Sequence, residues 1–205
     1  MATGNLSLLS TEPLQLELPD ADVRLWPQAL TAAEADSLFA ALRAGIQWQA
    51  EDIVIFGQPR RVPRLVAWHG DPGTGYTYSG TMHEPRPWTP ELRRLLDRVQ
   101  ALTGHPYNSV LLNLYRDGND GMGWHADDEP ELGRNPVIAS VSLGATRRFK
   151  LRHRRQRDVT ATLELGHGDV LLMAGTTQHT YVHAVPKTAR VVGERINLTL
   201  RHIAR

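Results

Sequence analysis

The spacing of hydrophobic residues along the chain changes near residue 105. Before that point, two segments place their apolar residues at helical intervals, at 30–45 and 89–104. Helix-start and helix-stop residues flank both segments: Thr31, Glu34 and Gly45 for the first, and Thr89, Pro90 and Gly104 for the second. We therefore predict two helices in the first half of the chain.

Beyond residue 105 the apolar residues alternate with polar ones, the period of a strand. Seven segments follow this pattern between turns rich in Gly, Asn, Asp and Pro: 108–116, 135–144, 147–154, 159–165, 168–175, 179–185 and 194–203. The pattern predicts a mainly β protein with flanking helices. A double-stranded β-helix (jelly-roll) core is favoured over a Rossmann-type fold, because helices do not alternate with these strands.

The length of 205 residues suits a single domain, which we place at residues 21–205 after a flexible N-terminal arm at 1–20. The first residues do not resemble a signal peptide, and no apolar run is long enough to cross a membrane. The chain has no cysteine, which excludes disulfides and thiolate metal sites. We expect a cytoplasmic protein, associated with the nucleoid if it is bacterial and nuclear if it is eukaryotic.

The formal net charge is only +1, but the positive charges are unevenly distributed. The segment "RRFKLRHRRQR" (147–157) carries seven Lys or Arg residues and no acid, and "FGQPRRVPR" (56–64) carries three arginines. One such segment is usually a solvated face. Two of them in a nearly neutral chain favour a surface that contacts phosphates.

The segment "GWHADDEP" (123–130) suggests metal chemistry. His125 and Asp127 would lie on the same side of an extended segment, and Glu129 would continue that side while Asp128 points away. An acidic surface loop would have the same composition. A third ligand is available from either His179 or His183. Two histidines and one carboxylate leave three positions on iron(II) for a bidentate cosubstrate and O2.

The last predicted strand, "RINLTLR", separates polar from apolar side chains. Its polar side consists of Arg195, Asn197, Thr199 and Arg201. An amphipathic strand with a wet face is the ordinary interpretation. Alternatively, the polar side lines the interior of a barrel, where two guanidinium groups require anions. A dicarboxylate would satisfy them, and Asn113 and Tyr115 of a neighbouring strand could add hydrogen bonds.

The order of these motifs, N-x-Y, H-x-D, His and R-x-N-x-T-x-R, resembles the AlkB family of iron(II) and 2-oxoglutarate dioxygenases, which remove alkyl groups from nucleic-acid bases. The likeness extends from about residue 53 to residue 203. The segments "NLYRDGNDGMGWHADDEPELGRNPVIASVSLGATRRF" and "PRLVAWHGDPGTGYTYSG" look especially like the animal homologues that act on DNA and RNA.

The resemblance implies Fe(II), 2-oxoglutarate and O2 as cofactor and cosubstrates. It implies His125, Asp127 and His183 as the iron ligands, with His183 preferred because "HAVP" matches the family's distal H-x-x-P motif. The residues implied for 2-oxoglutarate are Asn113, Tyr115, Arg195, Asn197 and Arg201. The implied reaction is oxidative demethylation of bases such as 1-methyladenine and 3-methylcytosine. It releases formaldehyde and converts 2-oxoglutarate to succinate and CO2.

The resemblance also implies a nucleotide-recognition lid at about 50–85, ahead of a catalytic core at about 105–205. Glu129 matches a base-reading position, and Asp128 is a weaker candidate with a turn or surface role as its alternative. The resemblance also implies that Tyr76, Tyr78 and Ser79 surround a flipped base. Phe56 would fill the gap that this base leaves, and Arg64 would lie near its orphaned partner base. Lys187, Arg190 and the segment 147–157 would contact phosphates.

The expected partner is therefore nucleic acid, with no membrane and with the chain as a monomer. The finger around Phe56 resembles homologues that prefer duplexes, whereas "PRLVAWHG" and "GRNPVIAS" resemble the one that favours single strands, so strand preference is undecided. The choice between DNA and RNA is equally open. Two other functions are compatible with parts of the pattern: an iron oxygenase acting on a protein or small molecule, and a non-catalytic nucleic-acid-binding module.

Overall fold

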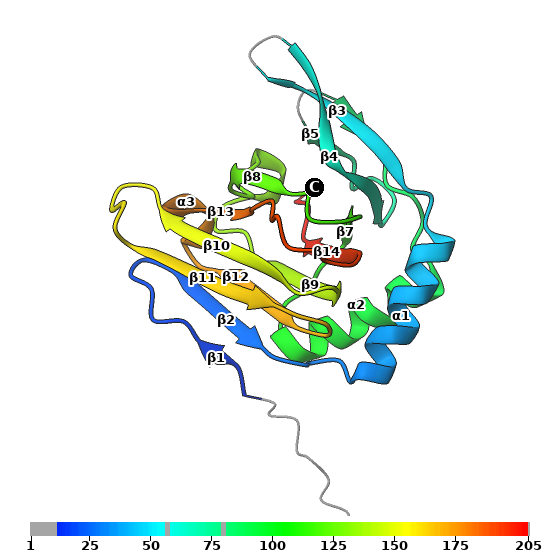
Figure 1. The fold of residues 1–205 in the computed structure, drawn as a ribbon, viewed down its shortest axis with the longest axis horizontal. Helices are drawn as coiled ribbons and strands as arrows, with labels where there is room; N and C mark the ends of the chain where they lie inside the picture. The colour runs from blue at the N-terminus through cyan, green and yellow to red at the C-terminus, as the bar shows by residue number, and fades with distance from the viewer. Residues whose placement is uncertain (1–11, 56–57, 79–80, 205) are drawn as a thin grey trace, which may run out of the picture.

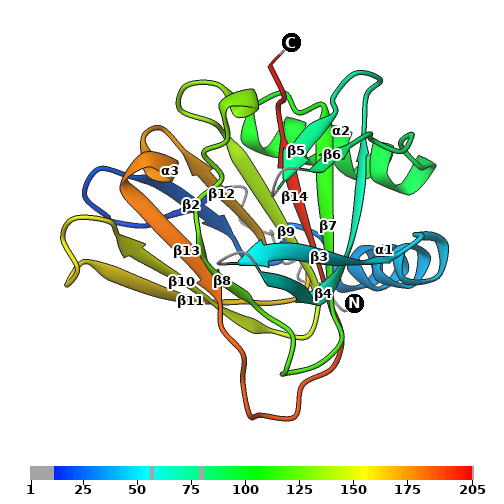
Figure 2. The ribbon, with the colours of Figure 1, turned by 90° about the horizontal axis from the view of Figure 1, so that it is seen from above.

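The computed structural model describes residues 12–55, 58–78 and 81–204. Two antiparallel sheets face each other, and two helices, α1 (Ala32–Gly45) and α2 (Pro90–Thr103), pack on the outer side of the larger sheet (Figures 1 and 2). This arrangement confirms a mainly β fold with flanking helices and a jelly-roll core.

The larger sheet has eight strands. Their order across the sheet is β1 (Leu14–Gln15), β2 (Asp22–Trp26), β12 (Val170–Ala174), β9 (Ile138–Gly144), β14 (Arg195–Arg201), β7 (Ser109–Tyr115), β4 (Gln58–Gly70) and β3 (Gln49–Ile55). The smaller sheet has the order β11 (Thr160–Leu165), β10 (Arg147–His153), β13 (Tyr181–Val185) and β8 (Met122–His125). The remaining elements are a hairpin of β5 (Tyr76–Tyr78) and β6 (Thr81–His83), the 3₁₀ helix η1 (Pro130–Leu132) and the short helix α3 (Thr177–Thr180).

The local signals in the sequence act as expected. All seven predicted strands form, as β7 and β9 to β14. Thr31 caps α1 in a capping box with Glu34, and Thr89 caps α2 by accepting a hydrogen bond from the Leu92 amide. Gly104 ends α2 at φ 73°, a left-handed conformation that favours glycine, whereas α1 runs through Gly45 and is capped by Ile46.

The larger sheet buries two faces of different character. Alternate residues of its central strands pack with α1 and α2 in one apolar core: Val110, Leu112 and Leu114 of β7, Ala139, Val141 and Leu143 of β9, and Ile196, Leu198 and Leu200 of β14. The residues between them face the smaller sheet. This inner face therefore carries the polar side chains of β14 and β7 into the space between the two sheets.

The N-terminal segment corrects one expectation. Residues 1–11 lie outside the described part of the chain, but β1 pairs with β2, and the Leu16 amide donates to the Val23 carbonyl at 2.9 Å. The Tyr181 hydroxyl donates to the Pro19 carbonyl at 2.9 Å. The chain is therefore bound to the sheet from Leu14 onward, and a loose arm extending to residue 20 is wrong for that part.

The segment expected to form a lid, at about 50–85, divides into two parts. The second half of β4 pairs with β7 and belongs to the larger sheet. The first half pairs with β3 in a hairpin that projects from the body of the molecule (Figure 1), and β5 and β6 form a separate hairpin. Within the described part of this segment, the β3–β4 hairpin is thus separate in character from the part of β4 that belongs to the larger sheet.

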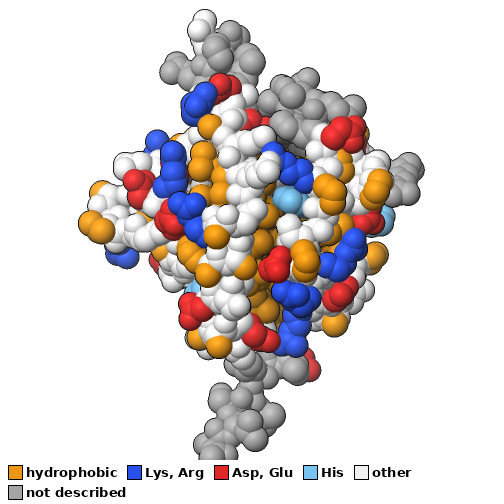
Figure 3. Space-filling model, turned by 90° about the vertical axis from the view of Figure 1, so that its right-hand side faces the viewer, with side chains coloured by type: hydrophobic (Ala, Val, Ile, Leu, Met, Phe, Trp, Pro, Cys, Tyr) orange, Lys and Arg blue, Asp and Glu red, His pale blue; other side chains and the backbone are white. Residues whose placement is uncertain are grey.

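Charged groups of both signs are interspersed on the face shown in Figure 3, with hydrophobic side chains between them. None of the helices in the described ranges is long and apolar enough to span a membrane.

Candidate functional site

Three potential metal ligands meet between the sheets. His125 on β8 pairs directly with His183 on β13, and Asp127 follows β8 by two residues. One donor atom from each of the three lies within 4.8 Å of the others. The fourth candidate, His179, lies on α3, where its exposed ring accepts a hydrogen bond from the Asn135 amide at 3.4 Å. The geometry therefore selects His183 over His179.

The protonation states of the three residues suit metal binding. His125 Nδ1 lies 2.9 Å from the Gly123 carbonyl oxygen, which can only accept, so Nδ1 carries the proton and Nε2 is free to coordinate. Burial, helped by the nearby His125, lowers the pKa of His183 to about 3, so its ring is neutral. Burial acts to raise the pKa of Asp127, but it is outweighed, chiefly by the Arg201 guanidinium, so that pKa is lowered.

Two side chains hold Asp127 in place. Arg201 Nη2 donates to Asp127 Oδ1 at 2.5 Å, and the Asp127 amide donates to the Gln178 side-chain oxygen at 3.0 Å. The side chain of Gln178 is fully buried although it belongs to a four-residue helix. Sequence reasoning missed Gln178, because only its place beside His179 in "TQHT" distinguishes it from a surface glutamine.

Arg195 lies on β14 on the same side of the strand as Asn197 and Arg201, which line the cavity, and it is only 1% exposed. Its Nη2 donates to Ser142 at 2.9 Å, whereas Nε and Nη1 have no hydrogen-bond partner among the described residues. The guanidinium carbon lies 5.3 Å from the centre of the Tyr115 ring. Burial lowers the pKa of Arg195, and a buried guanidinium is costly unless an anion compensates its charge.

The remaining residues expected at the cosubstrate lie around the same cavity. Asn113, Tyr115, Asn197 and Arg201 line it together with the three metal ligands. Asn197 donates to Ser140 at 2.8 Å, and Asn113 accepts from Arg64 Nε at 2.7 Å. The donor set fits Fe(II), and the unpartnered donors of a buried guanidinium fit a carboxylate group of 2-oxoglutarate.

A hollow of about 450 Å³ opens next to the metal ligands. It lies between β8 and β4 and includes Arg64, Trp124 and Lys187 in its lining. Met122, His125 and Val185 line both this hollow and the cosubstrate cavity. The hollow therefore adjoins the cosubstrate cavity at one of the metal ligands.

The residues expected to contact the substrate are more widely dispersed than those expected at the metal and the cosubstrate. Arg64 is buried and bonded to Asn113, so it stands between the cosubstrate cavity and the hollow rather than at an orphaned base. Asp128 is exposed and accepts from Arg154 at 2.6 Å. Glu129 precedes η1 and is half-buried, and neither acid is among the residues that line the hollow.

Four further candidates cannot be placed with their side chains. Tyr76 and Tyr78 belong to β5, whose backbone is described and whose side chains are not. Phe56 and Ser79 lie outside the described residues. Their assignment to the base-flipping machinery stays a prediction.

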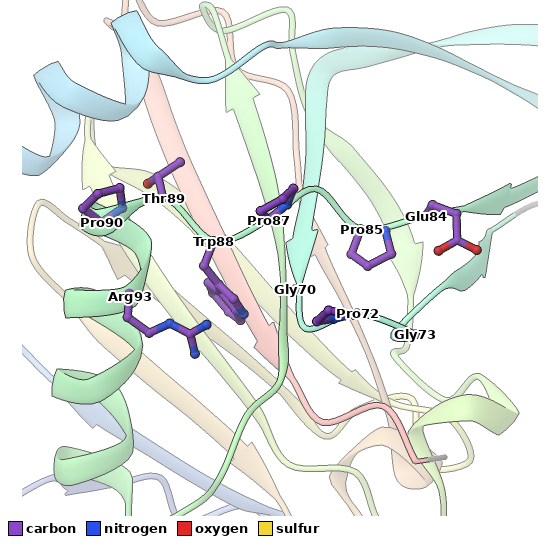
Figure 4. A pocket seen from close by; sticks show the side chains of 10 residues that line it. All are labelled: Gly70, Pro72, Gly73, Glu84, Pro85, Pro87, Trp88, Thr89, Pro90 and Arg93. Carbon is purple, nitrogen blue, oxygen red and sulfur yellow. The ribbon is translucent and has the colours of Figure 1, made fainter.

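A second hollow lies at the start of α2, lined by Trp88, Arg93 and four prolines (Figure 4). The Arg93 guanidinium carbon lies 5.1 Å from the centre of the Trp88 ring, and Trp88 Nε1 donates to Asp71 at 2.8 Å. This hollow shares no lining residue with the cosubstrate cavity or with the hollow beside His125.

Comparison with known proteins agrees with this site. The model of the 2OG-Fe(II) oxygenase superfamily matches residues 22–201. Human alpha-ketoglutarate-dependent dioxygenase alkB homolog 3 is 40% identical over 190 residues, which cover 88% of this chain and 66% of the relative. Bovine DNA oxidative demethylase ALKBH2 is 40% identical over 181 residues, covering 83% of this chain and 65% of the relative. The chain thus spans slightly less than two thirds of these relatives.

The comparison with solved structures concerns the fold alone. The structure of OsALKBH1 superposes with a TM-score of 0.66 at 18% identity, covering 93% of this chain and 99% of that one. An overlap of this extent at low identity supports the two-sheet architecture and leaves the choice of substrate to the site itself.

Proposed function

The chain belongs to the AlkB family within the 2OG-Fe(II) oxygenase superfamily, and from this premise we propose that it demethylates N-alkylated nucleic-acid bases oxidatively. The proposed substrates are bases such as 1-methyladenine and 3-methylcytosine in DNA, with RNA as a second polymer. The products are the repaired base, formaldehyde, succinate and CO2. The observation that carries the proposal is the cluster of His125, Asp127 and His183 in a cavity lined by Tyr115, beside which the buried Arg195 keeps donors without a partner among the described residues.

Different residues of the site would bind the metal and the cosubstrate. His125, Asp127 and His183 would hold Fe(II), which supplies the activation of O2 needed to oxidise an N-methyl group. Arg195 and Arg201 would bind the carboxylates of 2-oxoglutarate, with Asn113, Tyr115 and Asn197 adding polar contacts. Arg201 has a second role, because its hydrogen bond keeps Asp127 ionised and oriented.

The cavity also limits the access of water to the reacting groups. The Phe149 ring stacks on His183 with ring centres 5.2 Å apart, and Met122, Met173 and Val185 line the same cavity. Apolar walls around a charged site strengthen each electrostatic contact within it. These residues orient the ligands and exclude water without taking part in proton transfer.

The hollow between β8 and β4 is the proposed entry for the methylated base. Val62, Pro63 and Arg64 form part of its wall, and they belong to β4, whose first half forms the projecting hairpin with β3. We keep Phe56, Tyr76, Tyr78 and Ser79 as proposed contacts of a flipped base. Glu129 stays the proposed reader of a cationic base, and the ion pair of Asp128 with Arg154 favours a structural role for Asp128.

A demethylation assay tests the proposal directly. The protein is incubated with Fe(II), 2-oxoglutarate and single- or double-stranded oligonucleotides carrying 3-methylcytosine, and methyl loss is followed by mass spectrometry. We expect loss of the methyl group and stoichiometric formation of succinate. Protein shown to hold iron that demethylates neither strand form would overturn the proposal.

A pair of histidine variants tests the metal site separately from the substrate. His183→Ala should lose Fe(II) binding and all turnover, because it removes one of three ligands. His179→Ala is the matched control: it changes a histidine four residues away that is exposed and bonded to Asn135. If His179→Ala alone loses iron, the ligand assignment is wrong.

The proposed finger is tested by strand form. Phe56→Ala should slow demethylation of duplex substrates more than that of single strands, because only a duplex leaves a gap when a base flips out. Equal losses on both forms would contradict a role for Phe56 in filling that gap.

We further propose that the chain acts as a monomer in the compartment that holds the nucleic acid. One chain supplies all three metal ligands and both arginines. Size-exclusion chromatography at the concentration of the assay checks this: a dimer whose dissociation removes activity would contradict it.

A further inference from the structure

Trp124 has a role that neither the metal centre nor the cosubstrate cavity explains. It precedes His125 on β8, the edge strand of the smaller sheet, and it is 44% exposed. Because successive side chains of a strand point to opposite sides, the Trp124 indole faces outward while His125 faces the cavity. It nevertheless lines the hollow beside His125. A large aromatic side chain is thus exposed at the entry to the metal ligands.

A guanidinium group fixes the position of this ring. Arg152, on β10, places its guanidinium carbon 4.5 Å from the centre of the Trp124 indole, close enough for a cation–π contact. Arg152 therefore covers part of one face of the indole, while the Trp124 side chain as a whole stays 44% exposed.

The charges nearby indicate what kind of molecule would cover the indole. Lys187 lines the same hollow, and Arg148 and Lys150 precede Arg152 at two-residue intervals on the outward side of β10, where Arg148 pairs with Glu164. A planar group attached to negative charges matches an exposed aromatic ring with a guanidinium over one face and a lysine in the same hollow. A nucleobase in a strand has this chemistry, and stacking on an aromatic side chain suits any base because each has a π face.

We propose that Trp124, supported by Arg152, is a stacking platform for the base adjacent to the target base on the same strand. The inference rests on the proposed function, because it assumes that the target base enters the hollow beside His125. It assigns Trp124 a positioning role: the platform fixes the strand on one side of the target so that the N-methyl group is held at the metal ligands.

Binding to oligonucleotides with an abasic neighbour tests the platform. The probes are single-stranded DNA of fixed sequence with one 3-methylcytosine and either intact neighbours, an abasic site on its 5′ side, or one on its 3′ side. Fluorescence anisotropy is measured with the iron-loaded protein under anaerobic conditions without 2-oxoglutarate. We expect one abasic site to weaken binding by about 5- to 150-fold, the range for loss of one stacked base.

The variants decide whether Trp124 is responsible. Trp124→Ala should weaken binding of the intact probe by the same factor, and its affinity should no longer depend on the abasic site. Trp124→Phe should recover most of the affinity and most of the dependence on the abasic site. Arg152→Gln should give a smaller loss. Trp88→Phe, at a second Trp–Arg contact outside the hollow's lining, is the matched control and should bind like the unmodified protein.

Three results would overturn the platform. The first is a Trp124→Ala variant that binds the intact probe as tightly as the wild-type protein. The second is a loss of affinity in Trp124→Ala that adds to the loss caused by the abasic site. The third is tryptophan fluorescence that DNA quenches to the same extent in the wild-type protein and in Trp124→Ala. In each case the exposed indole would serve another partner. Demethylation of the intact probe is measured in parallel. If the wild-type protein demethylates the probe but Trp124→Ala does not change binding, the platform alone is rejected. If the iron-loaded protein does not demethylate the probe at all, the proposed function is rejected.

Discussion

The two faces of β14 show how one strand serves stability on one side and chemistry on the other. Ile196, Leu198 and Leu200 point toward α1 and α2 and are buried in an apolar core. The residues between them point toward the smaller sheet and are also buried: Arg195, Asn197, Thr199 and Arg201. Burial is therefore the same on both faces, and only the chemistry of the buried groups differs.

The difference matters because burial has opposite energetic signs on the two faces. Removing an apolar side chain from water stabilises the fold by about 25 cal/mol for each Å² buried. Removing a guanidinium from water costs several kcal/mol unless a partner compensates it. Arg201 has Asp127 as such a partner, whereas Nε and Nη1 of Arg195 find none in the part of the chain that the structure describes. The helix-side face thus stabilises a strand whose inner face is prepared for an anion.

The largest effect on folding is expected from the helix-side face. Leu198→Ala should lower the free energy of unfolding by about 2–5 kcal/mol, because the fully buried side chain leaves a cavity in a close-packed core. Urea denaturation measures the loss. Affinity for 2-oxoglutarate, measured below the unfolding transition, should not change. A parallel loss of affinity would show that the two faces of β14 do not act separately.

On the inner face of β14 we expect the reverse: a substitution should weaken the binding of 2-oxoglutarate and should not lower the free energy of unfolding. Arg195→Met should weaken 2-oxoglutarate binding by about 1.5–3 kcal/mol, equivalent to about 10- to 150-fold, because charge-assisted hydrogen bonds are lost. The free energy of unfolding should stay the same or rise, because a buried guanidinium is replaced by an apolar chain of similar size. Titration calorimetry and urea denaturation measure the two quantities.

An exposed arginine provides the control for that variant. Arg148→Met removes a guanidinium whose partner, Glu164, is also at the surface. It should leave 2-oxoglutarate affinity unchanged. If Arg195→Met destabilises the protein by more than the surface variant does, Arg195 supports the fold as well as the cosubstrate.

Much of this contrast could be predicted from the sequence. Alternation within "RINLTLR" and "SVLLNLY" identified the strands and separated their polar from their apolar residues. Choosing the barrel interior over a wet surface required the resemblance to a family, because a solvated strand has the same pattern. The helices were predictable for a simpler reason, since Thr31, Thr89 and Gly104 act on their immediate neighbours.

Features that depend on distant pairing could not be predicted in this way. Strand β2 joins the larger sheet beside β12, about 145 residues later in the chain, and nothing in "DVRLW" indicates that neighbour. Arg64 was expected near the orphaned partner base, and its hydrogen bond to Asn113 could not be foreseen, because it depends on how β4 pairs with β7. Gln178 and Trp124 acquire their roles only when β8, β10 and α3 come together.

A buried carboxylate outside the cavity offers a smaller test of compensated charge. Asp120 accepts hydrogen bonds from the Arg116 amide, Nε and Nη2 at 2.7–2.9 Å. Burial acts to raise the pKa of Asp120, but the contacts with Arg116 outweigh it and lower that pKa. A lowered pKa stabilises the folded state above the unfolded pKa, and this stabilisation is lost as the pH falls through the folded value.

Asp120→Asn should therefore cost about 1–2 kcal/mol at neutral pH and little in acid. Urea denaturation of both proteins at a series of pH values between about 3 and 7 measures the difference in their free energies of unfolding. That difference should be about 1–2 kcal/mol at the neutral end and should shrink toward the acid end. A constant difference across the series would mean that the ionised carboxylate is not the stabilising group. In contrast to Arg195, whose donors await a ligand, Asp120 is fully compensated within the chain.

The smallest effect separates two neighbouring acids at the site. Asp128 pairs with Arg154 at the surface, and exposed ion pairs contribute about 0.2–1 kcal/mol. Asp128→Asn should change the free energy of unfolding by no more than that and leave KM for a 3-methylcytosine oligonucleotide unchanged. Glu129→Gln, the matched variant one residue away, should raise KM, because it removes the proposed partner of a cationic base. If Asp128→Asn raises KM and Glu129→Gln does not, the two acids have exchanged roles, and the ion pair with Arg154 must open when substrate binds.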